Sequence, residues 1–132
     1  MSAEENKAVV RRVTEAIDER DLEALTELVA PEVLSGLRET LEWAYATFAD
    51  HRMSITDMVA EDDKVWVRLA TSGGYSGGWR GIPPTGQQWT NTGVAFYRLS
   101  DGKIVEADSL FDVANHVQQL GAKIVPPEQG ED

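Results

Sequence analysis

Three carboxylates near the end of the chain alternate along one predicted strand and are the residues best placed for acid–base chemistry. Because alternate strand residues share a face, Glu106, Asp108 and Asp112 project to one side. If that side faces an apolar pocket, desolvation would tune these carboxyls for general acid or base catalysis. Asp108 and Asp112 are separated by about 13 Å along the strand, too far to share a proton. They would therefore act on different atoms of one ligand, or only one of them is catalytic.

Both aspartates also have a purely structural interpretation. Asp112 directly precedes a predicted helix and suits its N-cap, because an Asp side chain accepts hydrogen bonds from backbone N–H groups there. Asp108 would then lie in solvent at the mouth of the pocket. Both interpretations stay open, and Asp112 and Asp108 are the first two candidate catalytic residues.

Tyr75 is the third candidate catalytic residue. Its hydroxyl can donate a hydrogen bond to a developing enolate or alkoxide, although a tyrosine in a bent strand also suits a core. The glycine pairs on either side of it allow close backbone approach to a ligand. Flat aromatic walls suit planar ligands, and they equally suit ordinary cores and interfaces. We expect substrate contacts from six residues: Trp43, Tyr45, Trp79, Trp89, Asn91 and Phe111.

Several other kinds of chemistry are disfavoured. The 132 residues contain no cysteine, which excludes disulfides, thiolate metal sites and cysteine nucleophiles. The glycines do not have the spacing of a phosphate-binding loop, and no nucleophile-elbow serine occurs. His51 is expected at a helix end, where a cation is favourable, and His116 either in solvent or packed. We expect no cofactor and no metal.

The charge balance limits the partners. Twelve basic against 23 acidic residues give a net charge of −11, and no run of Lys or Arg is present to bind a phosphate backbone. We expect no nucleic-acid partner. The apolar runs are short and the first residues are acidic, so we also expect no membrane partner and a cytoplasmic location. The expected partner is a small hydrophobic molecule.

The first third of the chain has a helical period. Ser2 and Glu5 form a capping box before apolar residues at helical spacing up to Ile17. Asp21 can cap a second helix that ends before Pro31. Ser35 can cap a third helix that extends to Phe48.

From Met53 the period changes to that of strands. Four or five antiparallel strands are predicted, including a long one over 88–99 and one from Lys103 to about Asp112, joined by a turn at 100–102. Trp66 and Arg68 alternate with the apolar residues and should lie on the outer sheet face. For the strand over 88–99 the inner face is ambiguous. A short helix over 113–120 ends at Gly121. The order predicts one α+β domain over 1–125, with helices on one face of the sheet and a disordered tail over 126–132.

The order of several motifs resembles the SnoaL-like polyketide cyclase family. The match includes the first two helices and, further on, Asp63-Lys64-Val65, the turn Gly81-Ile82-Pro83-Pro84-Thr85-Gly86, Asp101-Gly102-Lys103-Ile104-Val105-Glu106, Asp112 and Gln118-Gln119-Leu120-Gly121. The resemblance implies a cone-shaped α+β fold like nuclear transport factor 2 and ketosteroid isomerase, whose curved sheet and helices enclose a pocket. It also implies a homodimer through the outer face of the sheet. Asp112 is retained, whereas Tyr75 and Ala107-Asp108 stand where many members have histidine or His-Trp.

Two functions are consistent with these observations. The first is a cofactor-independent enzyme that cyclises or isomerises a hydrophobic polyketide-like or polycyclic intermediate, with epoxide hydrolysis as a variant on the same fold. The second is a non-catalytic module that binds a small hydrophobic ligand, favoured by the missing family histidines. A sealed pocket with Asp112 buried favours the enzyme, and a pocket filled by the chain's own tryptophans favours the binding module.

Overall fold

The computed structural model describes residues 1–128 and confirms the predicted α+β class. Three helices come first: α1 (Ala3–Asp18), α2 (Leu25–Leu28) and α3 (Pro31–Thr47). Four strands and one helix follow: β1 (Phe48–Glu61), β2 (Lys64–Tyr75), β3 (Gln88–Ser100), β4 (Lys103–Phe111) and α4 (Val113–Gln119). No helix within residues 1–128 has both the length and the apolar character needed to cross a membrane.

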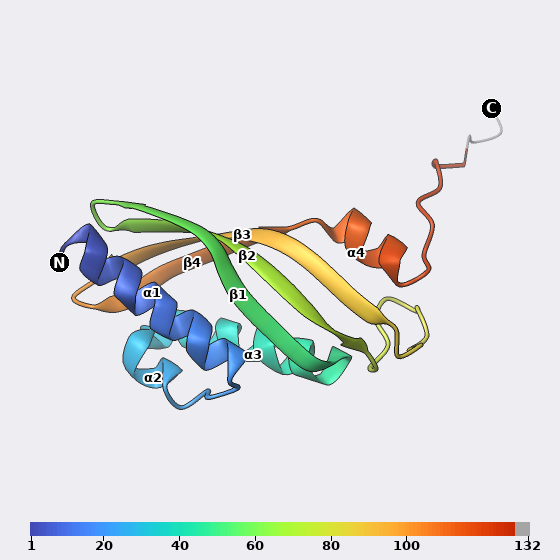
Figure 1. The fold of residues 1–132 in the computed structure, drawn as a ribbon, viewed down its shortest axis with the longest axis horizontal. Coiled ribbons are helices and arrows are strands. Elements are labelled where there is room, and N and C mark those ends of the chain that lie inside the picture. The colour runs from blue at the N-terminus through green and yellow to red at the C-terminus, as the bar shows by residue number, and fades with distance from the viewer. Residues whose placement is uncertain (129–132) are drawn as a thin grey trace.

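The four strands form one antiparallel sheet in the order β1-β2-β3-β4. The three N-terminal helices gather on one side of this long, twisted sheet, and α4 lies beside β3 at one end of the sheet (Figure 1). The β1–β2 and β3–β4 turns are both at the opposite end. We call these two regions the hairpin end and the α4 end.

The hairpin end contains the main apolar core. The capping box of Ser2 and Glu5 starts α1 as predicted, and the apolar stripe of α1 packs against β1 and β2. The strand residues that face it are Val65, Val67 and Leu69, each at most 2% exposed. The backbone of Ala30 donates to the carbonyl of Ile104, which ties the segment before α3 to β4.

Three predicted element boundaries in the first half were wrong. The second helix is only four residues long. Asp21 caps the turn before it, because its carboxylate accepts from the amide of Ala24 at 3.3 Å. The third helix begins at Pro31 and not at Ser35, because a proline at the first helical position lacks only an N–H that would have no helical partner. β1 follows α3 directly at Phe48, five residues earlier than expected.

A bulge near the start of β1 was also not predicted. The register shifts between Ala49 and Arg52, opposite Gly73, and Asp50 has a positive φ of 54°. The two strands approach closely there, since a Cβ on Gly73 would lie 2.9 Å from Cβ of Phe48. A bulge changes which face a side chain takes, and this one directs His51 into the interior.

The C-terminal segment follows the prediction to within one residue. Leu120 is the C-cap of α4, and Gly121 has the expected positive φ, 102°. Residues 126–128 are exposed and have no regular secondary structure. The rest of the predicted tail, 129–132, lies outside the described residues.

Candidate functional site

Asp112 lies at the junction of β4 and α4, beside an open groove of about 560 Å³. Its carboxylate Oδ1 accepts from the backbone amide of Asn115 at 3.0 Å, so the predicted N-cap is present. The side chain is exposed. The capping contact uses one of the two carboxylate oxygens, Oδ1, and the Asp112 side chain lines the groove.

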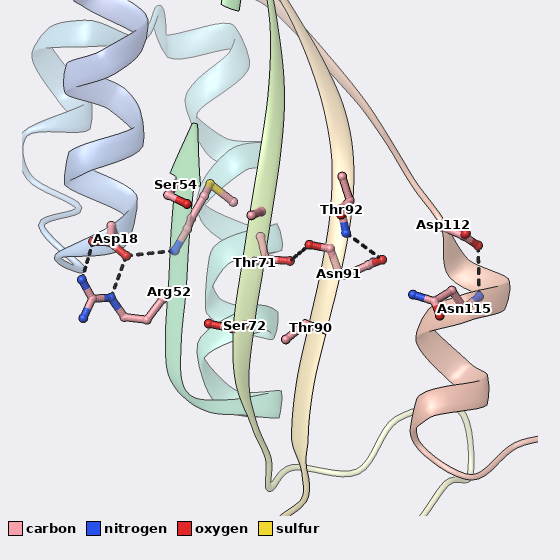
Figure 2. Close-up of a pocket in the computed structure, with 12 residues that line it drawn as sticks. Asp18, Arg52, Ser54, Thr71, Ser72, Thr90, Asn91, Thr92, Asp112 and Asn115 are labelled. Atoms are coloured by element: carbon pink, nitrogen blue, oxygen red, sulfur yellow. Dashed lines mark hydrogen bonds and ion pairs between the residues drawn. The ribbon is translucent and has the colours of Figure 1, made fainter. Parts of the chain in front are cut away.

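The groove runs from α4 across three strands to the end of α1 (Figure 2). Its floor includes outer-face residues that alternate with the core residues: Ser54, Ala70, Ser72, Thr90 and Thr92. At the far side Arg52 donates two hydrogen bonds to Asp18, each 2.8 Å long, and these bonds lower the pKa of the Asp18 carboxyl. The lining is therefore mostly hydroxyl and amide groups with one neutralised ion pair.

Asn91 connects this groove to the interior of the protein. It is 5% exposed, lies on the core-facing row of β3 and also lines the groove. Its Oδ1 accepts from the amide of Thr92 at 3.0 Å. β4 pairs with β3 only from Gly93 onward, so the edge of β3 at Asn91 faces α4 instead of another strand. The ambiguity about the inner face of β3 is thus resolved in favour of Trp89 and Asn91.

Asp108 is not one of the residues that line the groove. It pairs with Phe96 on the outer face of the sheet, is exposed, and accepts from the amide of Ser109 at 2.8 Å. Asp108 shares the outer face with the groove floor, but it lies further along the sheet and does not line the groove, whereas Asp112 does. Trp66 and Arg68 lie on this outer face as predicted, with Trp66 48% exposed and 4.9 Å from the ring of Phe96. The dimer through this face stays a prediction.

Tyr75 is fully buried at the end of β2. Its hydroxyl donates to the carbonyl of Ile82, and the carbonyl of Trp79 is also near, at 3.4 Å. This contact fastens the turn over 79–82 to the sheet. Because the hydroxyl hydrogen is already engaged, the geometry gives Tyr75 a structural contact and does not bring it to Asp112.

The predicted tryptophans meet in an aromatic cluster at the α4 end. We define it as the buried or half-buried residues Phe48, Tyr75, Trp79, Trp89, His116 and Leu120. Phe48 stacks on Trp89 with ring centroids 4.0 Å apart and planes 17° apart. Trp43, which is 39% exposed, closes the outer side against Trp79 at 5.5 Å. Three of the six expected ligand contacts therefore lie together.

Tyr45 and Phe111 are not part of this cluster. The hydroxyl of Tyr45 donates to the carbonyl of Ile17 at 2.6 Å, and Arg20 lies 4.7 Å above its ring. The ring of Phe111 lies against Gly93, where a Cβ would clash with it. Both side chains pack against the main core. The structure thus separates Tyr45 and Phe111 from the tryptophans.

Both histidines are buried, which for His116 is the packed one of the two positions that the sequence left open. His51 is 4% exposed and His116 is 6% exposed. Burial lowers the pKa of His51, so the predicted cation at a helix end was wrong and the ring is a neutral group on β1. Burial also lowers the pKa of His116 to about 4, with a smaller effect from Arg80. The one available signal was the spacing of His116 and Leu120, four residues apart and hence on one face of α4.

The comparisons with known proteins identify the family. The model of the SnoaL-like polyketide cyclase family matches residues 7–120. The chain belongs to the SnoaL-like polyketide cyclase family. The aklanonic acid methyl ester cyclase DnrD of Streptomyces peucetius is 29% identical over 109 residues, which cover 81% of this chain and 72% of DnrD.

Two solved structures have the same fold as this chain. IdmH from Streptomyces antibioticus, a proposed polyketide cyclase, is 27% identical with a TM-score of 0.80, over 89% of this chain and 99% of IdmH. AclR from Streptomyces galilaeus, a proposed hydroxylase, is 24% identical with a TM-score of 0.84, over 95% of this chain and 87% of AclR. Proteins of this fold thus carry the names of different reactions, and the reaction has to be argued from the site.

Four buried polar atoms at the α4 end of this SnoaL-like chain have no hydrogen-bond partner among the described residues. They are His51 Nδ1, Trp89 Nε1, Asn91 Nδ2 and His116 Nε2. Each such atom costs about 1–3 kcal/mol of unfolding free energy, so a group of them calls for an explanation. Within residues 1–128 no three His, Asp or Glu side chains gather closely enough to hold a metal ion. The four atoms are neutral hydrogen-bond donors or acceptors enclosed within the protein.

Proposed function

We propose that this SnoaL-like protein is a cofactor-independent enzyme that cyclises or isomerises a hydrophobic polyketide-like molecule, with Asp112 as its proton-transfer group. The observation that carries the proposal is the position of Asp112. Its carboxylate lies on the groove, on the helix whose next turn enters the aromatic cluster. A ligand with planar rings and carbonyl groups could contact both.

The proposed reaction needs only one proton-transfer group. Asp112 would remove a proton from a carbon next to a carbonyl, and the resulting enolate would attack a second carbonyl of the same molecule. The new carbon–carbon bond leaves an alkoxide, which takes the proton back from Asp112. Holding the two reacting carbons in one orientation supplies much of the rate, because the reaction is intramolecular.

Asn91 is the best candidate to stabilise the enolate oxygen. Its Nδ2 is buried without a partner among the described residues, and its side chain lines the same groove as Asp112. A fixed donor of this kind stabilises developing negative charge without having to reorganise. It would take the role that the sequence had suggested for Tyr75, whose hydroxyl is engaged with Ile82.

The test is the substitution Asp112→Asn. Asparagine is as good an N-cap as aspartate, so α4 should keep its place while the carboxylate is lost. With aklanonic acid methyl ester, the molecule in the name of the relative DnrD, as the first substrate to try, we expect turnover to fall by about 10²–10⁴-fold. Product formation is followed by liquid chromatography and mass spectrometry, beginning with any ligand retained through native purification.

The matched control is Asp21→Asn. Asp21 also caps a helical turn through its carboxylate, but it lies away from the groove. We expect this variant to keep the wild-type rate. An Asp112→Asn variant with wild-type turnover would remove Asp112 from the mechanism.

A second function is favoured by a specific observation, and we propose it as the alternative. The aromatic cluster fills the α4 end with the chain's own side chains, and Asp112 is exposed. Both features suit a module that binds a hydrophobic ligand without converting it. The alternative predicts a retained ligand that is unchanged after long incubation and equal binding by wild type and Asp112→Asn.

A further inference from the structure

His116 occupies the centre of an aromatic cage. Its ring centroid is 4.5 Å from that of Trp79, 4.5 Å from that of Trp89 and 5.4 Å from that of Phe48. The three interplanar angles are 33° to 34°. These separations are the usual ones between packed aromatic rings. The ring of His116 therefore packs against Trp79 and against the stacked pair of Phe48 and Trp89.

A histidine is a poor choice if the cage is only structural. His116 Nε2 and the nearby Trp89 Nε1 are both buried, and neither has a hydrogen-bond partner among the described residues. A phenylalanine at position 116 would fill similar space without the cost of an unpaired polar atom. The uncompensated polarity indicates that the ring is not the final occupant of the cage.

α4 is attached by few strong contacts. Within residues 113–120 only His116 and Leu120 are buried, and the others are exposed or half-buried. Its links to β3 are made by Gln119, whose side-chain amide donates to the carbonyl of Thr90 at 2.6 Å and accepts from its N–H at 3.0 Å. These two bonds are exposed, so water can replace them at little cost, and one partly buried bond, from the side-chain amide of Gln87 to the carbonyl of Gln119, remains. Figure 1 shows α4 beside β3, away from the other helices.

We propose that the cage of Phe48, Trp79 and Trp89 is a binding site for one planar ring of a ligand, and that α4 blocks this site with His116 until the ligand displaces it. Only the identity of the natural ligand rests on the proposed function. Asp112, at the base of α4, is the point about which the helix would swing. Release of His116 would also expose Trp89 Nε1, a donor for a ring hydroxyl or carbonyl.

The ligand chemistry follows from the cage. Three aromatic walls favour a flat ring over a saturated one, and neutral polar atoms favour an uncharged molecule. The class is an uncharged fused aromatic ring that carries hydroxyl or carbonyl oxygen. A suitable probe is 2-naphthol, with decahydro-2-naphthol as its saturated counterpart.

The deciding experiment is calorimetric titration of 2-naphthol into wild type and His116→Ala. If His116 competes with the ligand, its removal tightens binding. With the open form at 1–10% of the population, the gain is about 10–100-fold. His116→Phe keeps the cage filled, so it should bind no more tightly than wild type. Decahydro-2-naphthol should show little gain with any variant.

Gln118→Ala is the matched control on the same helix. Its side chain is exposed, so the variant should bind 2-naphthol as wild type does. Equal or weaker binding by His116→Ala would overturn the proposal, because it would mean that α4 covers the ligand and does not compete with it.

A second measurement serves if His116→Ala does not fold. In wild type, saturating 2-naphthol should speed amide hydrogen exchange in α4, whereas slower exchange there would overturn the proposal. Neither readout needs turnover. Asp112→Asn should bind 2-naphthol in either case, so failure of the cyclase assignment is distinguishable from failure of this inference.

Discussion

The hairpin end and the α4 end of the sheet are built on opposite principles. At the hairpin end, Val9, Val13, Leu25 and Val65 are at most 1% exposed, and the buried polar side chains of Asn6 and Thr14 both donate hydrogen bonds to backbone carbonyls. At the α4 end, His51, Asn91 and His116 are 4–6% exposed, and each has a polar atom without a partner among the described residues. The buried polar groups of the hairpin end are thus hydrogen-bonded, whereas those of the α4 end include atoms without a partner among the described residues.

The difference shows where this SnoaL-like chain can respond to a ligand. Apolar packing gains nothing from an incoming polar molecule, whereas unpaired donors and acceptors gain a hydrogen bond each. Regions of low local stability are also the ones that open first. On the proposal above, the hairpin end is the stable base and the α4 end is the part that responds to a ligand.

The largest expected effect is a difference in unfolding free energy between alanine substitutions of two buried leucines, Leu25 at the hairpin end and Leu120 at the α4 end. Leu25→Ala should lower the free energy of unfolding by about 2–5 kcal/mol, because Leu25 is 0% exposed and held between α1, α3 and the sheet. Leu120→Ala should cost only about 1 kcal/mol, since α4 can detach before the rest unfolds. Urea denaturation measures both variants. Equal losses would show that the α4 end is as firmly built as the hairpin end.

A smaller effect is expected from pH. The pKa of His116 is lowered to about 4, below its ordinary value of about 6.5, so the folded state favours the neutral ring. This contribution is fully present above about pH 6.5 and is lost as the pH falls toward 4. Between pH 7 and pH 5 we expect a loss of about 1–2 kcal/mol from this group. Urea denaturation at the two pH values measures it.

The charged surroundings of His116 define the control for this pH effect. Arg80 lies 4.8 Å above the ring of Trp79 and opposes protonation, and His51 lies on Trp89 at 6.3 Å with its own pKa lowered. Asp112 is one turn earlier on α4. His116→Phe removes only the titration of His116. Its loss of unfolding free energy between pH 7 and pH 5 should therefore be about 1–2 kcal/mol smaller than that of the wild type. An identical loss in both proteins would assign the pH dependence to other groups.

The sequence predicted the hairpin end much better than the α4 end. The capping box at Ser2, the alternation of Val65 and Val67, and the turn at Asp101-Gly102 are local patterns with one physical interpretation each. The inward turn of His51 depends on a bulge opposite Gly73, which is a property of two strands together. The face of the sheet that carries Asp108 was left open, because it follows from the pairing of β4 with β3 and cannot be read from alternation alone.

The smallest effect tests the unpaired polar atoms directly. His51 and Tyr45 are ring neighbours, with centroids 5.8 Å apart, but Tyr45 Oη donates to Ile17 whereas His51 Nδ1 has no partner among the described residues. His51→Phe should therefore raise the free energy of unfolding by about 0.5–1 kcal/mol, because it removes an unpaired polar atom and keeps a ring. Tyr45→Phe should lower it by about 1 kcal/mol, because it breaks a satisfied bond. Thermal unfolding of the two variants compares the signs. If both substitutions destabilise, His51 Nδ1 is satisfied in solution, and the contrast between the two ends of the sheet loses one of its supports.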